Sequence, residues 1–457
     1  MENPRDNGAT KHRKGRRVVL FPLPLQGHIS PMLQLANILC SKGFAITIIH
    51  TRFNSPSSSK HPNFSFISIS DGLSESEAST ADVIALVTVL NVNCVLPFRN
   101  CLAKLLSDSL EEPVACIITD ADWHFTQAVA DSFKLPRIVL RTSSVFSFFA
   151  YATLPVLRER GYFPIEESQL EEPVPNLSPL KAKDLPLIDS RDPEDLYRLF
   201  SCIFKDIKVS SGLIWNTFEE LEQSELITFG QEFPIPVFPV GPLHRYFPAS
   251  TGSLLTEDRS CLSWLSTQAP KSVLYVSFGS LAAFDETQFE AMAWGLAKSK
   301  QPFLWVVRPG LVRGSEWLET LPNGFLETIE GRGHIVKWAP QQEVLAHPAT
   351  GGFCTHNGWN STFESICEGV PMICLPCHGD QKVNARYVTD VWKIGVHLEN
   401  RLESGEIERA IRRLMVDSEG HEMRDRVMNL KEKVDLSLRQ GGSYRALESL
   451  ISHISSF

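Results

Sequence analysis

Short hydrophobic runs alternate along the chain with stretches in which apolar residues recur every three or four positions. The first run, residues 17–23, is almost continuously apolar, as expected for a parallel strand that is covered on both faces. A helical pattern follows, for which we expect residues 31–42 with Ser30 as the N-cap and Pro31 at the first helical position. This alternation predicts a parallel sheet flanked by helices.

Further strand patterns fall into two groups. In the N-terminal half we expect strands at residues 44–50, 64–69, 114–119 and 137–141. In the C-terminal half we expect strands at residues 272–278, 303–307, 334–337, 351–355 and 371–375. The pattern predicts an α/β protein with two Rossmann-like, doubly wound domains, whose ligand site lies in the cleft between the carboxyl ends of their strands.

Two proline-rich stretches interrupt the alternation. Residues 160–195 combine several prolines with many acids, which indicates an irregular surface excursion. Residues 234–252 are rich in Pro, Gly and Ser, a composition typical of an interdomain linker. We therefore expect three parts, which are a disordered basic tail over 1–16, an N-terminal domain over 17–245 and a C-terminal domain with the closing helices over 253–457.

Composition excludes several classes of protein. The 457 residues carry a net charge of -9, which disfavours nucleic acid and anionic membranes as partners. The one candidate membrane span, residues 83–98, is shorter than the ~20 apolar residues that a bilayer requires, so we expect a buried helix and no membrane insertion. The ten cysteines lie mostly in apolar stretches and the N-terminus lacks a signal peptide, so we expect a cytoplasmic protein.

The common nucleotide-binding motifs are absent from the sequence, and one short metal-binding pattern is present. The chain lacks a Walker A pattern, and its GxG at Gly331 and Gly333 is followed by Val336 where a dinucleotide fingerprint requires glycine. Asp120 and Asp122, separated by one alanine, match the Asp-x-Asp pair of one class of sugar transferases. A metal-dependent sugar transferase is therefore one hypothesis.

The most informative segment begins at Trp338 and ends at Gln381. It opens with WAPQQEVLAH, continues through GGFCTHNGWNSTFESICEGVP and closes with HGDQ. Its middle part has the pattern of a buried strand over 351–355, a turn at His356 and a helix over 358–368. Because the first turn of a helix has free N–H groups and the positive end of the helix dipole, we expect an anion site there.

Polar side chains near this anion site can add contacts to a nucleotide. His356, Asn360 and Ser361 supply further hydrogen-bond donors. Glu364, one turn further along, can accept from ribose hydroxyls, as acids do in other nucleotide-binding folds. Trp338 follows a predicted strand and offers a flat face for a base. The segment therefore combines groups suited to each part of a nucleoside diphosphate.

This segment resembles the forty-four-residue signature box of the plant secondary-product UDP-glycosyltransferases, and its aromatic, His, Gly-Trp-Asn-Ser, Glu and Asp-Gln positions have the family spacing. The likeness continues through GHISP, SFGS and FLWVVRPG, so it covers the chain from Arg17 onward. The chain is most similar to the branch that contains the stevia glucosyltransferase of steviol glycosides. The resemblance implies a two-domain GT-B fold, inverting transfer from a UDP-sugar, and no metal or cofactor.

The resemblance also implies a role for each position of the box. Trp338 would stack on uracil, the backbone of Ala339 would pair with its edge, and Gln341 and Glu364 would hold the ribose. The diphosphate would be bound by Ser280, His356, Asn360 and Ser361. The sugar hydroxyls would be bound by Trp359, Asp380 and Gln381.

Three further positions bear on the sugar pocket. Gln381 at the closing position is the family's usual sign of a glucose donor, whereas histidine there favours galactose. His378, two residues before Asp380, stands where the family more often has Trp or Phe, and either packing or pocket lining is open for it. Thr142, at the end of a predicted strand, would reach the 6-hydroxyl of the sugar or the acceptor.

A hydroxyl acceptor needs a base, which typically contributes about 10²- to 10⁴-fold in rate. His28, in the loop after the first strand, has a suitable unperturbed pKa of about 6.5. Asp120 at the end of the 114–119 strand rises from the same sheet edge and can orient the ring. In the family, the histidine of the GH motif is the base and the aspartate at this place orients it.

The acceptor is less well determined. We expect contacts from residues 73–96, 144–157 and 160–195, with four aromatic residues that either line an apolar pocket or belong to the core, Phe146, Phe148, Phe149 and Tyr151. These features predict a monomeric UDP-glucose-dependent glucosyltransferase that forms a β-glucoside on a flavonoid, terpenoid, phenolic or existing glycoside. The alternative is a nucleotide-sugar-binding sensor without turnover.

Overall fold

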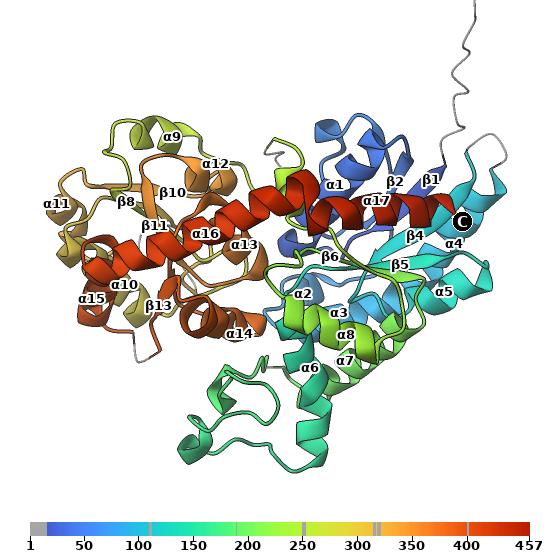
Figure 1. Ribbon diagram of the computed structural model, residues 1–457, viewed down its shortest axis with the longest axis horizontal. Coiled ribbons are helices and arrows are strands. Elements are labelled where there is room, and N and C mark those ends of the chain that lie inside the picture. Colours follow the sequence, from blue (N-terminus) through green and yellow to red (C-terminus); the bar gives the residue numbers. More distant parts are fainter. Residues whose placement is uncertain are drawn as a thin grey trace, which may run out of the picture.

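The computed structural model describes residues 16–108, 112–188, 190–248, 253–313, 317, 321–399 and 402–457. The predicted basic tail lies outside the described residues, apart from residue 16. Two parallel sheets form the centres of two lobes, one from each half of the chain (Figure 1). The Rossmann-like architecture expected from the alternating pattern is therefore confirmed.

The N-terminal sheet has seven strands in the order β3-β2-β1-β4-β5-β6-β7. Their bounds are β1 Arg17–Phe21, β2 Ala45–Thr51, β3 Phe64–Ile69, β4 Val114–Asp120, β5 Arg137–Arg141, β6 Gly212–Trp215 and β7 Val237–Pro239. The C-terminal sheet has six strands in the order β10-β9-β8-β11-β12-β13. Their bounds are β8 Val273–Ser277, β9 Phe303–Val306, β10 Gly333–Val336, β11 Thr350–Thr355, β12 Met372–Cys374 and β13 Gly395–His397.

Helices connect these strands and cover both faces of each sheet (Figure 1). In the N-terminal half they are α1 Gln26–Ser41, α2 Glu75–Ala78, α3 Val83–Asn93, α4 Val95–Ser107, α5 Thr126–Ser132, α6 Val145–Glu159, α7 Pro193–Lys208 and α8 Gln223–Glu232. In the C-terminal half they are α9 Ser260–Leu265, α10 Glu286–Ser299, α11 Phe325–Ile329, α12 Gln341–Ala346, α13 Trp359–Glu368, α14 Asp380–Arg386, α15 Ser404–Met415, α16 Ser418–Gln440 and α17 Gly442–Ser455.

Helix α1 begins a turn and a half earlier than its sequence predicts. Leu25 is its N-cap and Pro31 lies inside it, so the expectation of a start at Pro31 with Ser30 as the cap is wrong. Proline has no N–H to donate to the carbonyl four residues earlier, and the carbonyl of Gly27 accepts from Nδ2 of Asn360 at 2.8 Å instead. His28 therefore lies in the first turn of a helix and not in a loop.

The last helix returns to the domain in which the chain begins. Figure 1 shows α16 running from the C-terminal lobe to the N-terminal one, where α17 lies against the sheet. Leu447 and Leu450 of α17 belong to the same buried core as Val18 and Leu20 of β1. The expectation that all closing helices belong to the C-terminal domain is thus wrong for α17, because its apolar face packs on the first sheet.

The apolar segment 83–98 forms two helices and not one. Within the described residues, no single helix is long and apolar enough to cross a membrane, although α3 and α4 together, bent by 48°, pass by length and composition. Ile84, Val87 and Leu90 of α3 are buried in a hydrophobic cluster that includes residues of both domains, as expected for a buried helix. The excursion after α6 is irregular as predicted, with 3₁₀ turns and a lone bridge between Pro173 and Lys181.

Candidate active site

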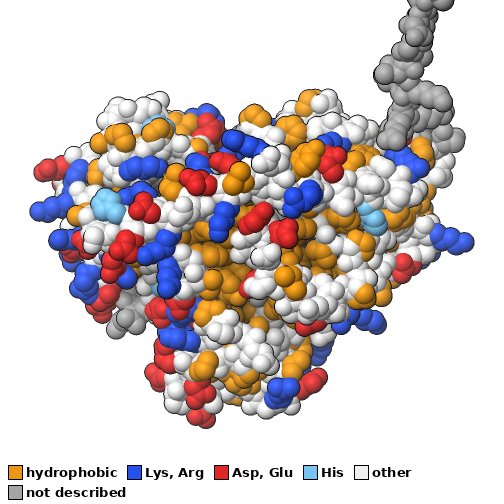
Figure 2. All heavy atoms as spheres, viewed as in Figure 1, with side chains coloured by type: hydrophobic (Ala, Val, Ile, Leu, Met, Phe, Trp, Pro, Cys, Tyr) orange, Lys and Arg blue, Asp and Glu red, His pale blue; other side chains and the backbone are white. Residues whose placement is uncertain are grey.

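A cavity of about 370 Å³ lies between the two lobes and is lined by residues of both. On the face shown in Figure 2, hydrophobic side chains also gather in the hollow at the junction of the lobes. All but one of the predicted site residues line the cavity, namely His28, Thr142, Ser280, Trp338, Ala339, Gln341, His356, Trp359, Asn360, Ser361, Glu364, Asp380 and Gln381. The exception is Asp120, which lies behind His28.

His28 and Asp120 form a hydrogen-bonded pair at the edge of the N-terminal sheet. Nδ1 of His28 lies 2.8 Å from Oδ2 of Asp120, and Oγ1 of Thr142 lies 3.3 Å from the same nitrogen. Asp120 is only 1 % exposed, whereas His28 keeps 23 % of its side chain accessible. The backbone N–H of Asp122 donates to the other oxygen of Asp120 at 3.1 Å. The carboxylate thus fixes the ring and leaves Nε2 available to a ligand.

The surroundings of His28 change its proton affinity. Burial lowers the pKa of the imidazole, but the charge and hydrogen bond of Asp120, helped by the charge of Asp122, outweigh this effect and raise the pKa to about 9. In the unliganded protein the ring is therefore mostly protonated at pH 7. It becomes a base as the pH rises toward its pKa.

Each carboxylate of the Asp-x-Asp pair binds a basic side chain of the protein. A ring nitrogen of His28 and carboxylate oxygens of Asp120 and Asp122 lie within 4.8 Å of one another, a spacing that a cation could use. However, Oδ1 of Asp122 accepts from Nη1 of Arg141 at 3.0 Å, and Asp120 is bound to His28. A guanidinium beside these carboxylates neutralises the charge that a divalent cation would require, so the donor set fits a metal poorly.

The N-terminus of α13 and a neighbouring loop form a cradle around His356. A Cβ at Gly279 would lie 2.7 Å from Nε2 of His356, and one at Gly358 would lie 2.6 Å from it, so both positions must be glycine. Burial is the main cause that lowers the pKa of His356 to about 3. The neutral ring, beside Ser280 and the free N–H groups of α13, can donate to an anion without carrying charge.

Two other predicted diphosphate residues already have partners. Nδ2 of Asn360 donates to the Gly27 carbonyl across the cleft, and Oγ of Ser361 accepts from Nε2 of Gln341 at 2.9 Å. A phosphate at α13 would have to compete with the carbonyl for Asn360. The contact places the N-terminus of α13 directly against the turn that carries His28.

The predicted ribose pair is preformed. Nε2 of Gln341 donates to Oε2 of Glu364 at 2.7 Å, and Gln342 donates to Oε1 at 2.9 Å. Burial raises the pKa of Glu364. Trp338 and Ala339 precede α12 in the same wall of the cavity. The residues predicted for the base, the ribose and the phosphates thus follow one another from Trp338 through α12 to α13.

The predicted sugar residues begin α14. Oε1 of Gln381 accepts from the backbone N–H of Cys377 at 2.9 Å and of His378 at 3.1 Å, which fixes the side-chain amide. Nδ2 of Asn384 donates to Oδ2 of Asp380 at 3.4 Å. His378 lines the cavity, so the structure favours pocket lining over packing for this unusual residue.

Trp359 does not present its side chain to a sugar. Its indole N–H donates to the carbonyl of Asn216 at 2.8 Å, and its ring stacks on Phe363 at 5.3 Å. The side chain is 3 % exposed. The indole N–H is committed to the other domain, so the predicted contact of Trp359 with a sugar hydroxyl would have to come from its backbone.

Comparison with known proteins agrees with this geometry. The model of the family described as UDP-glucoronosyl and UDP-glucosyl transferase matches residues 48–433. The chain is 55 % identical over 441 residues to UDP-glycosyltransferase 76B1 of Arabidopsis thaliana, covering 96 % of this chain and 98 % of that one. It is 51 % identical over 465 residues to UDP-glycosyltransferase 76G1 of Stevia rebaudiana, covering 100 % of both.

The chain belongs to the UDP-glycosyltransferase family. Among solved structures it is similar to Phytolacca americana UGT2 complexed with UDP-2-fluoro-glucose and pterostilbene, with a TM-score of 0.81 and 28 % identity over 96 % of this chain and 100 % of that one. The protein is therefore a plant family 1 glycosyltransferase with the GT-B fold. The resemblance read from the signature box is confirmed.

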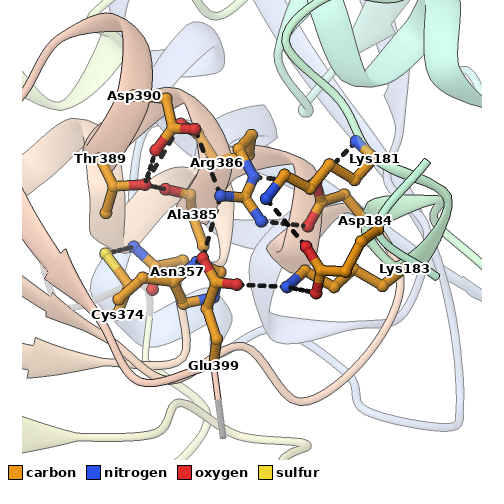
Figure 3. A network of polar contacts seen from close by, with 12 residues as sticks. Lys181, Lys183, Asp184, Asn357, Cys374, Ala385, Arg386, Thr389, Asp390 and Glu399 are labelled. Atoms are coloured by element: carbon orange, nitrogen blue, oxygen red, sulfur yellow. Dashed lines mark hydrogen bonds and ion pairs between the residues drawn. The ribbon is translucent and has the colours of Figure 1, made fainter. Parts of the chain in front are cut away.

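A buried polar network, which sequence reasoning missed, holds α14 of this glycosyltransferase in place (Figure 3). Arg386 binds Asp184 of the N-terminal excursion through two nitrogens at 2.8 and 3.0 Å, and it also donates to Glu399 at 2.9 Å. Lys183 contacts Glu399 as well. The excursion thus fixes the helix whose first turn carries Asp380 and Gln381.

Asn384 is a second missed contact between the domains. Its Oδ1 accepts from the hydroxyls of Ser144 at 3.0 Å and Ser147 at 3.1 Å, and its Nδ2 donates to the Asn357 carbonyl at 2.9 Å. Its spacing of four residues from Asp380 was a usable signal, because residues i and i+4 share a helix face. No sequence pattern predicted its contacts with Ser144 and Ser147, because these residues are distant in the sequence.

The aromatic residues of α6 divide between core and pocket. Phe146 stacks on Tyr387 of the other domain at 3.6 Å, and Phe148 and Phe149 pack in or against the N-terminal core. Tyr151 lines the cavity and stacks on Phe200. One of the four therefore contributes to the apolar pocket.

Proposed function

We propose that this UDP-glycosyltransferase transfers glucose from UDP-glucose to a hydroxyl of a small lipophilic metabolite, a flavonoid, terpenoid, phenolic or their glycosides, with inversion to a β-glucoside. The observation that carries the proposal is the His28–Asp120 pair, which borders the same cavity as the preformed nucleotide residues. We further propose that the enzyme acts as a cytoplasmic monomer without metal or cofactor.

The proposed step is a direct displacement at the anomeric carbon. Nε2 of His28 takes the proton of the acceptor hydroxyl while its oxygen bonds to that carbon, and the bond to the UDP oxygen breaks with its electron pair leaving on the β-phosphate. Asp120 stabilises the imidazolium that forms. The N–H groups of α13 and the ring of His356 face the charge that develops on the leaving phosphate.

The acceptor side of the cavity supports a lipophilic substrate. Apolar side chains from several elements of the N-terminal domain line it, namely Leu25, Val83, Ile84, Val87, Ile188, Leu199 and Phe200. Burying apolar substrate surface contributes about 25 cal/mol per Å². A planar or fused-ring metabolite would gain most from such a wall.

Removal of the base tests the proposed mechanism. We expect His28→Ala to lower turnover with UDP-glucose and a responsive acceptor by at least ~10²-fold, while UDP binding measured by calorimetry stays within about threefold. The assay contains EDTA, and we expect full wild-type activity in it. Retained turnover in the variant, or loss of wild-type activity in EDTA, contradicts the mechanism. UDP binding without turnover on a broad acceptor panel indicates the sensor alternative.

The donor sugar is tested at Gln381. This residue's amide is oriented by two backbone N–H groups, and a histidine cannot reproduce both the accepted and the donated hydrogen bonds. We expect Gln381→His to shift the ratio of kcat/KM for UDP-glucose over UDP-galactose toward galactose by at least about tenfold. Lys382→His, one residue further on α14, is the control. An unchanged ratio contradicts the sugar contact.

A further inference from the structure

An ion pair lies in the wall of the cavity beside the proposed base. Asp122 follows β4 and Arg141 ends β5, and both residues line the cavity. Nη1 of Arg141 lies 3.0 Å from Oδ1 of Asp122, and the two side chains are only 7 % and 20 % exposed. Nε of Arg141 donates to Oγ of Ser143 at 2.9 Å, so the guanidinium has a fixed orientation.

Stability does not explain a pair in this position. Desolvating two charges often costs as much as their attraction returns, and well-packed apolar residues of similar size are frequently as stable. The neighbouring wall of the pocket is apolar, with Leu25, Val87 and Leu199 among its residues. The pair is therefore a polar feature within an apolar acceptor site, which points to a role in recognition.

One oxygen of Asp122 remains available to a ligand. Oδ1 is held by Arg141, and among the described residues Arg141 is the one side chain that hydrogen-bonds to the Asp122 carboxylate. A carboxylate oxygen of Asp122 lies within 4.8 Å of a ring nitrogen of His28. Because Asp122 and His28 line the same cavity at this short separation, an acceptor whose hydroxyl lies at His28 has room to place a neighbouring polar group against Asp122.

We propose that Asp122, held by Arg141, is a specificity-determining residue that accepts a hydrogen bond from a second hydroxyl or N–H group, on the atom next to the glucosylated oxygen of the acceptor. The enzyme would prefer catechols, vicinal diols and sugar hydroxyls over isolated hydroxyls. The inference rests on the proposed function, because the role of His28 defines where the reacting oxygen lies.

Charge selects the kind of group that Asp122 binds. The guanidinium of Arg141 already compensates the carboxylate, so a cationic acceptor gains little. Asp380 in the cavity wall and Asp120 behind His28 disfavour an anionic acceptor. A neutral donor needs no further compensation. A hydrogen bond to a charged group is also stronger than one between neutral groups.

Three matched acceptors test the proposal. The probes are 4-butylcatechol, 4-butylphenol and 4-butyl-2-methoxyphenol, of which the last keeps the second oxygen but has no proton on it. We expect kcat/KM with UDP-glucose to be at least ~10-fold higher for the catechol than for either of the others, as a hydrogen bond to a charged group provides. Binding to the UDP-loaded enzyme, measured by calorimetry, should show the same order.

Removal of the pair should abolish the preference. In Asp122→Leu with Arg141→Met, which removes both charges of the pair together, we expect the catechol-to-phenol ratio of kcat/KM to fall at least fivefold. The matched control is Lys42→Met with Glu448→Leu, which removes a surface ion pair of the same kind and should keep the wild-type ratio. Asp122→Asn, a milder variant, should give an intermediate ratio.

The outcomes separate the inference from the proposed function. Equal binding and turnover of the three probes by the wild-type enzyme overturns the inference, as does an unchanged ratio in the double variant. Preferred binding of the catechol without glucose transfer to any acceptor supports the recognition site and overturns the proposed function. Failure to bind any of the three probes overturns the inference.

Discussion

Asp120 has two opposing effects on His28 at neutral pH, because it orients the ring and also raises its pKa. Asp120 orients the ring through a bond of 2.8 Å to Nδ1, but the same carboxylate stabilises the protonated form. Burial lowers the pKa, and the attraction of Asp120 then raises it to about 9. The carboxylate that orients the proposed base therefore also reduces the fraction of neutral imidazole at pH 7.

The pH dependence of the reaction follows from this pKa. We expect kcat/KM for the acceptor to rise with pH by up to tenfold per unit below about 9 and to level off above it. In Asp120→Asn the inflection should move to lower pH, because the attracting charge is gone. Initial rates between pH 6 and 10 check both profiles, and a flat wild-type profile contradicts His28 as the base.

The contribution of His28 to folding stability depends on pH in the opposite direction to the expected activity. Because the folded-state pKa lies above the unfolded value of 6.5, the contribution is fully present below pH 6.5 and is lost as the pH rises through about 9. Activity thus increases over the range in which this contribution to stability disappears.

The contact between His28 and Asp120 could be predicted from the ends of their strands, whereas the orientation of other side chains could not. His28 and Asp120 were expected together because β1 and β4 are neighbours whose carboxyl ends meet at one edge. The orientation of Trp359 depends on the carbonyl of Asn216, which lies in the other domain. Because Asn216 lies far from Trp359 in the sequence, no local sequence pattern predicts this hydrogen bond.

Helix α6 has an unusual acid at its N-terminus. Oε1 of Glu222 accepts from the backbone N–H groups of Val145 at 2.7 Å and Phe146 at 3.2 Å. The side chain is 1 % exposed, and burial raises the pKa of the carboxyl to about 8, outweighing these hydrogen bonds. Glu222 thus accepts hydrogen bonds from two N–H groups that have no partner within the helix. The burial of its carboxyl group disfavours the charged form.

The pH dependence of unfolding tests this position. An acid with a raised pKa contributes most to stability below its unfolded value of 4.5 and loses that contribution as the pH rises to about 8. We expect Glu222→Gln to be as stable as the wild type at pH 5 and more stable by at least ~1 kcal/mol at pH 8.5. Denaturant unfolding at both pH values measures this, and the same difference at the two pH values contradicts it.

The sequence pattern revealed the long strands and some of the short ones. Runs such as those of β2 and β4, seven residues each, are long enough to show their apolar character. The strands β6, β7 and β13 have only four, three and three residues. None of these three was predicted, and β7 lies in the stretch expected to be linker. Short strands give a weak signal by periodicity, although β9, β10 and β12, with four, four and three residues, were predicted.

Contacts of the whole molecule join the two domains at several places. The chain crosses between them before β8 and again from α16 to α17, and side chains add the Asp184–Arg386 pair and the bonds of Asn384. Both members of the ion pair are 3 % exposed. Losing one partner of such a pair leaves an uncompensated buried charge.

The buried pair can be tested against an exposed one in the same excursion. We expect Asp184→Asn to lower the free energy of unfolding by about 3 kcal/mol, because Arg386 loses a bidentate partner. The control is Glu171→Gln, since Glu171 is 65 % exposed and binds Lys181 and Lys183, and its loss should cost less than about 1 kcal/mol. Equal effects in denaturant unfolding contradict the assigned role of the pair.

The return of α17 brings the two ends of the described chain together. Nη1 of Arg16, just before β1, donates to the carbonyl of Ser455 in α17 at 3.0 Å. A short linker could join these ends, and the chain could be reopened in the turn between α15 and α16 without cutting either sheet. Such a circular permutant would carry the whole N-terminal domain, α17 included, ahead of the C-terminal sheet.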